Sequence, residues 1–182
     1  MEFPDHPLWD FSLEVYARPG VEPACLALQE AHGADVNVLL AVIWHGARGL
    51  RLSPAELDRL GGAVADWRER VVRPLRAVRR DMKAALGAPA PMADRLRNRV
   101  KRLELDAEHL EQLLLAQLLP GGGEDVDLSP DTALAAAAAN ARAYLESLGA
   151  GTDATQHLAA ILAGVFPDLP AAAVAAALEA AA

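Results

Sequence analysis

Arginine is the residue type in this sequence with the clearest capacity for chemistry, because guanidinium groups bind carboxylates and phosphates through a fork of hydrogen-bond donors. Of the 17 lysines and arginines, 12 lie between Arg68 and Arg102, where only three acidic residues occur. The chain as a whole carries a formal net charge of −8. This separation of charge predicts either an internal network of ion pairs or a surface that docks an anionic partner.

The candidate basic surface lies on two helical stretches joined by a short turn. An antiparallel helical hairpin would bring both stretches toward one tip, where they could bind an acidic protein or phosphates. The surface consists of Arg73, Arg76, Arg79, Arg80, Arg95, Arg99 and Arg102. The competing interpretation, which we slightly favour, is neutralisation inside the chain by Asp125, Asp127 and the acidic half of the following helix. No recognition helix, RNA-binding aromatic motif or zinc module accompanies these arginines, and the net acidity argues against a general nucleic-acid binder.

A second candidate site collects polar and aromatic side chains from the N-terminal helices. It would be a pocket formed by Asp35, Asn37, Trp44, His45 and Trp67. The plainer interpretation of the same residues is helix capping and hydrogen bonding between helices.

Signatures of catalysis and metal binding are missing from the sequence. It has no GxSxG nucleophile motif, and the glycines at 121–123 lack the Lys-Ser/Thr of a phosphate-binding loop. The single cysteine, Cys25, excludes an intramolecular disulfide and a CxxC site. Asp106 and His109 form one imperfect copy of a di-iron motif that needs two, so a solvated acidic face is the better interpretation. We therefore assign no catalytic residue, no metal ligand and no cofactor.

Signals for the starts and ends of helices divide almost the whole chain. We expect helices at 7–17, 21–32 and 35–46, the last capped by Asp35 and deeply buried, although its β-branched residues leave a strand open. Ser53 and Glu56 form a capping box at the start of a fourth helix. Pro74 should kink or divide that helix.

The longest helix is predicted at 92–119, after a turn at 87–91. Its apolar positions repeat in steps of three and four and form a heptad seam over three repeats. The seam consists of Leu96, Val100, Leu103, Ala107, Leu110, Leu114 and Gln117. Together with the preceding helix it is typical of an antiparallel helical hairpin.

The expected fold class is all-α: an N-terminal helical core, a long antiparallel hairpin and an alanine-rich helical C-terminal segment. We place the core and hairpin in residues 1–119, a linker at 120–128 and the alanine-rich segment at 129–182. Because alanine buries little area, we expect the packing of the last segment to be weakly specified.

The N-terminus lacks the basic start and apolar run of a signal peptide, and no uninterrupted apolar stretch has the length of a membrane span. We therefore expect a cytoplasmic protein with no membrane span.

Two stretches of sequence carry a family resemblance. They are LWDFSLEVYARPGV at 8–21, continued by ACLALQE at 24–30 and HGADVNVLL at 32–40, and WRERVVRPLRAVRR at 67–80. This sequence resembles a family of small proteobacterial proteins called domain of unknown function 2390, over about Leu8 to Leu119. The resemblance implies an intact bacterial protein and transfers no catalytic residue.

The sequence leaves three functions open. The first is a non-enzymatic interaction or regulatory module whose basic hairpin docks an acidic partner or self-associates. The second is a small-molecule-binding protein or enzyme with a pocket near Trp44 and His45, and the third is nucleic-acid binding through the hairpin.

Overall fold

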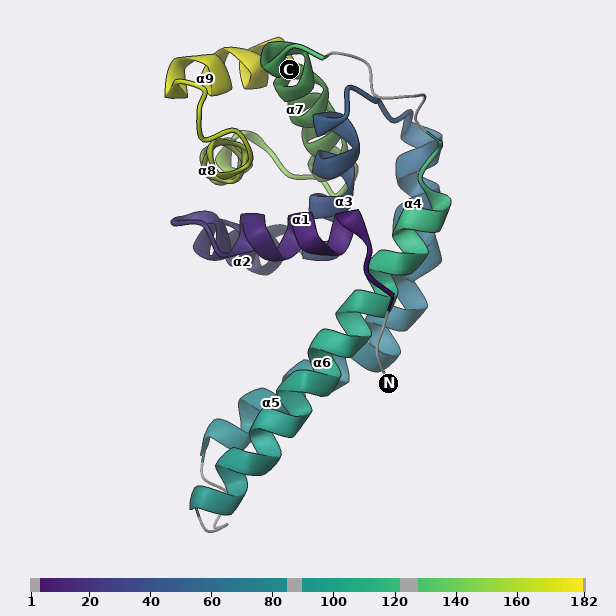
Figure 1. The fold of residues 1–182 in the computed structure, drawn as a ribbon, viewed down its shortest axis with the longest axis vertical. Coiled ribbons are helices and arrows are strands. Elements are labelled where there is room, and N and C mark those ends of the chain that lie inside the picture. Colours follow the sequence, from purple (N-terminus) through teal and green to yellow (C-terminus); the bar gives the residue numbers. More distant parts are fainter. Residues whose placement is uncertain (1–3, 85–89, 122–127, 182) are drawn as a thin grey trace.

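The computed structural model describes residues 4–84, 90–121 and 128–181. These residues form helices and turns, with no strand among them, so the all-α prediction is confirmed. One group of helices makes a body, from one side of which a long helical arm projects (Figure 1). The body contains α1 (Pro7–Tyr16), α2 (Val21–His32), α3 (Val36–Ala47), α7 (Pro130–Ser147), the 3₁₀-helix η3 (Thr152–Ala154), α8 (Thr155–Val165) and α9 (Ala171–Ala180).

Local capping sets the ends of the N-terminal helices. Asp35 accepts hydrogen bonds from the backbone N–H groups of the first turn of α3. Gly33 ends α2 with φ of +68°, a conformation that costs glycine little. Ser53 and Glu56 form the predicted capping box at the start of α4 (Pro54–Trp67). These features are local, and the sequence predicted each of them.

Pro74 divides the fourth helix in a specific way. The segment before it, η1 (Arg68–Val72), is a π-helix, and α5 (Arg73–Asp81) and a 3₁₀ turn, η2 (Met82–Ala84), follow. Proline has no N–H, so the carbonyl of Arg70 has no donor four residues further on. The helical turn before Pro74 is therefore wider by one residue, as in a π-helix. The N–H of Arg73 accordingly bonds to the carbonyl of Arg68, five residues back.

The long helix α6 (Ala90–Leu118) lies beside α4, η1 and α5 (Figure 1). Its N-terminus lies inside the stretch predicted as a turn at 87–91, since Ala90 and Pro91 are already helical; residues 85–89 lie outside the described part of the chain. Proline is tolerated in a first helical turn because its missing N–H would have no partner there.

Contacts along α6 establish that it runs opposite to the segment beside it. Arg59 donates to the carbonyl of Leu118 at 2.6 Å, and Trp67 Nε1 donates to the carbonyl of Ala107 at 2.9 Å. Below, we call η1, α5, η2 and the first part of α6 (residues 90–106) the arm.

The apolar core is centred on α3, which packs most extensively against α7. Gly46 permits this contact, because a Cβ there would lie 2.4 Å from the Cα of Ala137. Small side chains on both helices therefore allow α3 and α7 to approach closely. The composition predicts weakly specified packing for the alanine-rich segment, but at this contact the small residues are what the interface requires. One apolar cluster takes residues from both sides of 120–128. The domain division stays a prediction, and most of its linker, 122–127, lies outside the described residues.

Within the described residues, no single helix is long and apolar enough to cross a membrane. Only α2 and α3 taken together reach that length and composition, and they are bent by 120°.

Candidate functional site

Arg76 is the centre of a charged cluster at the base of the arm. Its Nε donates to Glu104 Oε1 at 3.1 Å, and its other nitrogens donate to Glu108 and to Gln29 of α2. Arg79 donates to both oxygens of Glu104. The cluster thus joins α5, α6 and α2, and it neutralises two of the seven predicted surface arginines inside the chain.

The pKa values of the two carboxylates differ because their neighbours differ. Burial acts to raise the pKa of Glu104, but hydrogen bonds from Arg79 and Arg76 outweigh it and hold that pKa below its usual value. Glu108 has only Arg76, so burial dominates and raises its pKa. Burial acts to lower the pKa of Arg76, but Glu108 and Glu104 raise it. Arg76 is therefore a fixed cation.

A second polar cluster lies where the N-terminus of α3 meets α6. Asn37 Nδ2 donates to Glu111 Oε2 at 3.0 Å, and Gln112 Nε2 donates to Asn37 Oδ1 at 3.0 Å. Asp35 Oδ2 receives Arg68 Nη1 at 3.3 Å, and the N–H of Asp35 donates to the hydroxyl of Tyr144 at 2.8 Å. Since the π-helix contains Arg68, the widened turn before Pro74 supplies the cation that reaches Asp35.

Glu111 in this cluster carries a proton at neutral pH. Burial, then the negative charge of Asp35 and the hydrogen bond joining the two carboxyl groups, raise the pKa of Glu111 to about 9. A hydrogen bond between two carboxyl groups requires one of them to be protonated, and Glu111 is the more buried, at 1% exposure. The cluster is therefore a neutral acid held against a carboxylate whose counter-ion is Arg68.

The five residues of the predicted pocket are not brought together. Asp35 and Asn37 belong to the polar cluster just described, whereas Trp44 and His45 lie between about two and three turns further along α3. Arg48 covers Trp44 at 4.7 Å from the ring centroid. His45 is fully buried, and burial followed by the charge of Arg48 lowers its pKa, so its ring is neutral. Trp67 packs at α6, where its Nε1 bonds to Ala107.

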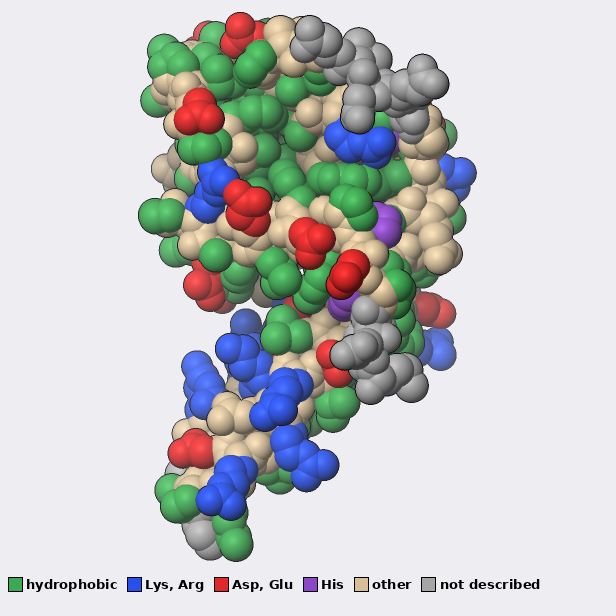
Figure 2. Space-filling model, in the orientation of Figure 1, with side chains coloured by type: hydrophobic (Ala, Val, Ile, Leu, Met, Phe, Trp, Pro, Cys, Tyr) green, Lys and Arg blue, Asp and Glu red, His purple; other side chains and the backbone are tan. Residues whose placement is uncertain are grey.

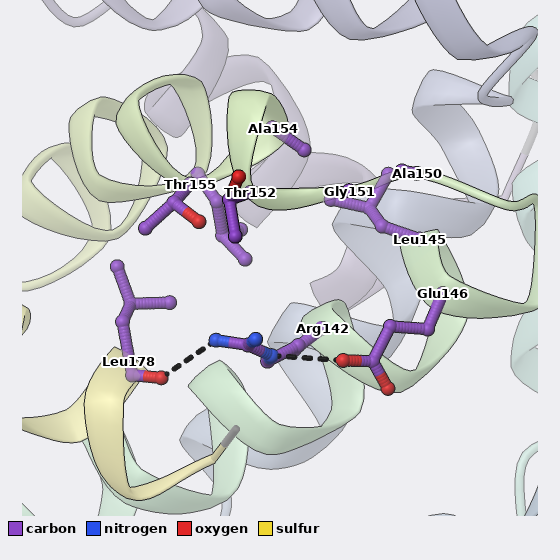
Figure 3. Close-up of a pocket in the computed structure, with 10 residues that line it drawn as sticks. Arg142, Leu145, Glu146, Ala150, Gly151, Thr152, Ala154, Thr155 and Leu178 are labelled. Carbon is purple, nitrogen blue, oxygen red and sulfur yellow. Dashed lines mark hydrogen bonds and ion pairs between the residues drawn. The ribbon is translucent and has the colours of Figure 1, made fainter.

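Two adjoining cavities lie elsewhere, between α7, α8 and α9, and Figure 3 shows the smaller of them. Their volumes are about 150 and 590 Å³, and Arg142, Thr152, Thr155 and Leu178 line both. Arg142 already donates to Glu146 at 2.9 Å and to the carbonyl of Leu178 at 3.0 Å. Its charge is therefore largely occupied. No signal in the sequence pointed to this site, because its lining is mostly small and unpatterned.

The acidic half of α6 is only partly a solvated face, which corrects the sequence interpretation: Asp106 is exposed, but other acids are buried. Glu104 and Glu111 are only 5% and 1% exposed. His109 stacks on Trp9 with 4.3 Å between ring centroids and an interplanar angle of 3°. Among the described residues, no group of three or more His, Cys, Asp or Glu side chains could hold a metal ion.

The exposed faces of the arm contrast with the charged cluster at its base. Four of the predicted surface arginines are exposed and form no ion pair within the described residues: Arg80, Arg95, Arg99 and Arg102. Arg73 is bound to Glu69 at 2.8 Å on the surface. Figure 2 shows Lys and Arg side chains spread over the arm, with hydrophobic side chains at its end. Asp125 and Asp127, two of the predicted counter-charges, lie outside the described residues.

The heptad seam of α6 is split between the interior and the surface. Ala107 is buried, and Leu114 packs against the core. The leucines at seven-residue spacing, Leu96, Leu103 and Leu110, are instead 52%, 55% and 40% exposed. The open side of the seam therefore begins in the basic part of α6, at Leu96, and continues through Leu103 to Leu110 in its acidic half.

These observations define an all-α protein with a helical body and a projecting, basic, partly apolar arm. The chain belongs to the family described as protein of unknown function DUF2390, whose model matches residues 7–115. That range includes the whole arm, all of the charged cluster around Arg76 and all of the second polar cluster except Tyr144. No curated protein and no solved structure matches the chain.

Proposed function

We propose that this protein is a non-enzymatic interaction module whose arm docks an acidic protein partner. The observation that carries the proposal is the division of the arm's arginines. Arg76 and Arg79 are neutralised at the base, whereas Arg80, Arg95, Arg99 and Arg102 are exposed and have no ion pair within the described residues. A cytoplasmic location, which the sequence predicts, is part of the proposal.

Energetics supports a docking role for the outer arginines. Exposed cations crowded on one arm repel each other slightly, and an anionic partner relieves that repulsion and is attracted from a distance. Arginine is enriched at protein interfaces because its planar guanidinium binds carboxylates and packs on apolar groups. Exposed leucines beside the arginines add the apolar area that a polar patch alone would lack.

The alternative of a small-molecule site near Trp44 and His45 has less support. Its five residues are divided between separate surroundings, and His45 is fully buried. Nucleic acid competes for the same guanidinium groups and is therefore an outcome of the test rather than a second proposal.

The test is site-specific photo-crosslinking in cells of the organism that encodes the protein. A photoreactive phenylalanine analogue replaces Arg99 on the arm or, as a matched control, Glu30, an exposed residue on α2. We expect a discrete acidic protein to be captured from position 99 and not from position 30. Arg80→Glu, Arg95→Glu and Arg102→Glu together should abolish capture.

Equal adducts from both positions, adducts insensitive to the charge reversals, or adducts removed by nuclease would contradict the proposal. Circular dichroism of each variant checks that the helices are intact.

A further inference from the structure

We infer that the arm's partner presents an acidic amphipathic helix, which packs along α6 over Leu96, Leu103 and Leu110. This inference rests on the proposed function and specifies the chemistry of the partner.

The leucines define a narrow line suited to one helix. Residues seven apart on an α-helix return to the same side with a drift of about 20° per repeat. Leu96 and Leu110 are 14 residues apart, which corresponds to about 21 Å of helix. A stripe this narrow fits one helix packed alongside, as in a coiled coil, whereas a helix that packs into a broad surface needs a wider apolar face.

Among the residues that the structure describes, the packing covers one side of the seam. The segment with Arg76 and Arg79 packs on the side of α6 that carries Glu104, and Trp67 packs at Ala107. Leu96, Leu103 and Leu110 lie next to that side and are left open. A further helix packed along these three leucines would bury them, and α6 would then be covered on this side as it is covered by α5 on the neighbouring one.

Charge identifies the partner as acidic. Arg95 and Arg102 immediately precede Leu96 and Leu103, and Arg99 lies between the two leucines on the same face. In coiled coils the residues that flank the apolar seam select the partner through opposite charges. Around Leu96 and Leu103 the flanks are basic and exposed, and Asp106 is the one exposed acid beside the stripe among the described residues. The positions of the partner helix that face Arg95, Arg99 and Arg102 therefore carry Glu or Asp.

The same charges disfavour a second copy of this chain as the occupant. Two copies paired through these leucines would bring Arg95, Arg99 and Arg102 of both into one contact, with Asp106 the nearest exposed acid on that side of α6. A lipid surface is also disfavoured, because amphipathic helices that bind membranes bury a wide apolar face, which Arg99 interrupts here.

The probes are stapled, fluorescein-labelled helical peptides of about three heptads, the length of the stripe. One carries leucines at heptad positions and glutamates at the flanks, a second has the same composition with the leucines out of phase, and a third has lysine in place of glutamate. Fluorescence anisotropy measures binding to the full chain at low and high salt. We expect the in-phase acidic peptide to bind at least about tenfold more tightly than the others, and salt to weaken it.

Matched variants of the full chain locate the site. Leu103→Asp should weaken the in-phase peptide at least about tenfold, because it places a charge in the centre of the seam. Leu105→Asp is the control: Leu105 is 38% exposed and lies on the opposite side of α6. Arg99→Glu should weaken binding, whereas Arg70→Glu, at another exposed cation, should leave it within about twofold. All four positions are at the surface, and circular dichroism verifies their helices.

Several results would overturn the inference. They are equal binding of the out-of-phase peptide, equal loss in Leu103→Asp and Leu105→Asp, binding only to anionic phosphatidylglycerol vesicles, or a dimer in sedimentation velocity that Leu103→Asp dissociates. If crosslinking from position 99 succeeds while the peptides fail, the helical partner is wrong and the interaction module stands. If crosslinking fails, the proposed function is wrong.

Discussion

The base and the outer part of the arm use the same residue type in opposite ways. At the base, Arg76 and Arg79 are bound to Glu104 and Glu108 and join three helices. Further out, arginines such as Arg99 are exposed beside exposed leucines and have no ion pair in the described chain. The difference teaches that tertiary surroundings, rather than residue type or helix position, separate an arginine that holds the fold together from one that is available to a partner.

The largest contrast is expected from removing one arginine at each place. Arg76→Ala leaves Glu104 and Glu108 without their shared cation and should lower the free energy of unfolding by about 3 kcal/mol. Arg99→Ala, the matched control, should change it by less than about 0.5 kcal/mol. Urea denaturation followed by circular dichroism measures both. Equal changes in the free energy of unfolding for Arg76→Ala and Arg99→Ala would contradict this distinction between the two arginines.

A smaller, pH-dependent effect tests the neutral acid near the base of the arm. Glu111 binds a proton in the folded state up to about pH 9 but loses it near its ordinary pKa when unfolded. Its contribution is therefore fully present at acidic pH and is lost progressively as pH rises through that window. In Glu111→Gln the amide can donate to Asp35 at every pH, and Arg68 still pairs with Asp35.

Between about pH 6 and about pH 7.5, the free energy of unfolding of the wild type should fall by about 2 kcal/mol more than that of Glu111→Gln. Subtracting the free energy of unfolding of Glu111→Gln from that of the wild type at each pH removes the effect of the other titrating groups, because both proteins contain them. A parallel pH dependence in urea denaturation would show that Glu111 ionises in the folded protein as it does in the unfolded one.

The smallest effect comes from the indole that joins the start of the arm to α6. Trp67→Phe removes the hydrogen bond to the carbonyl of Ala107 and should destabilise the protein by about 1 kcal/mol. Trp44→Phe is the comparison, since Trp44 contacts the ring of His6 and the guanidinium group of Arg48 through its own ring. Thermal unfolding measures both, and a larger loss in Trp44→Phe would contradict this account of Trp67.

Much of the fold followed from local sequence signals. The helix at 21–32, the cap at Asp35 and the capping box of Ser53 and Glu56 were predicted correctly, because each depends on residues within one helical turn. The family resemblance was also confirmed. Pro74 was expected to kink or divide the helix. It does divide it, but the π-helix that precedes it was not predicted.

The candidate sites were harder to predict. Glu104 and Glu111 belonged to a run of acids whose simplest interpretation was a solvated face, and both are buried. Asp35 caps the buried helix that contains Trp44, and the two were predicted to share a pocket, yet about two and a half turns separate them. In each case the sequence named the right residue types and misjudged what they face.

The sequence by itself determined the helices, their caps and the concentration of arginine in one segment, because these depend on neighbours within a few residues. Tertiary structure alone decided which arginines are neutralised: Arg76 meets Glu104 across 28 positions, and Gln112 meets Asn37 across 75. Coulomb attraction and desolvation act through space, so the counter-charge of a side chain is set by how helices pack. At Leu96, Leu103 and Leu110 the same packing decided which side of a heptad seam stays open.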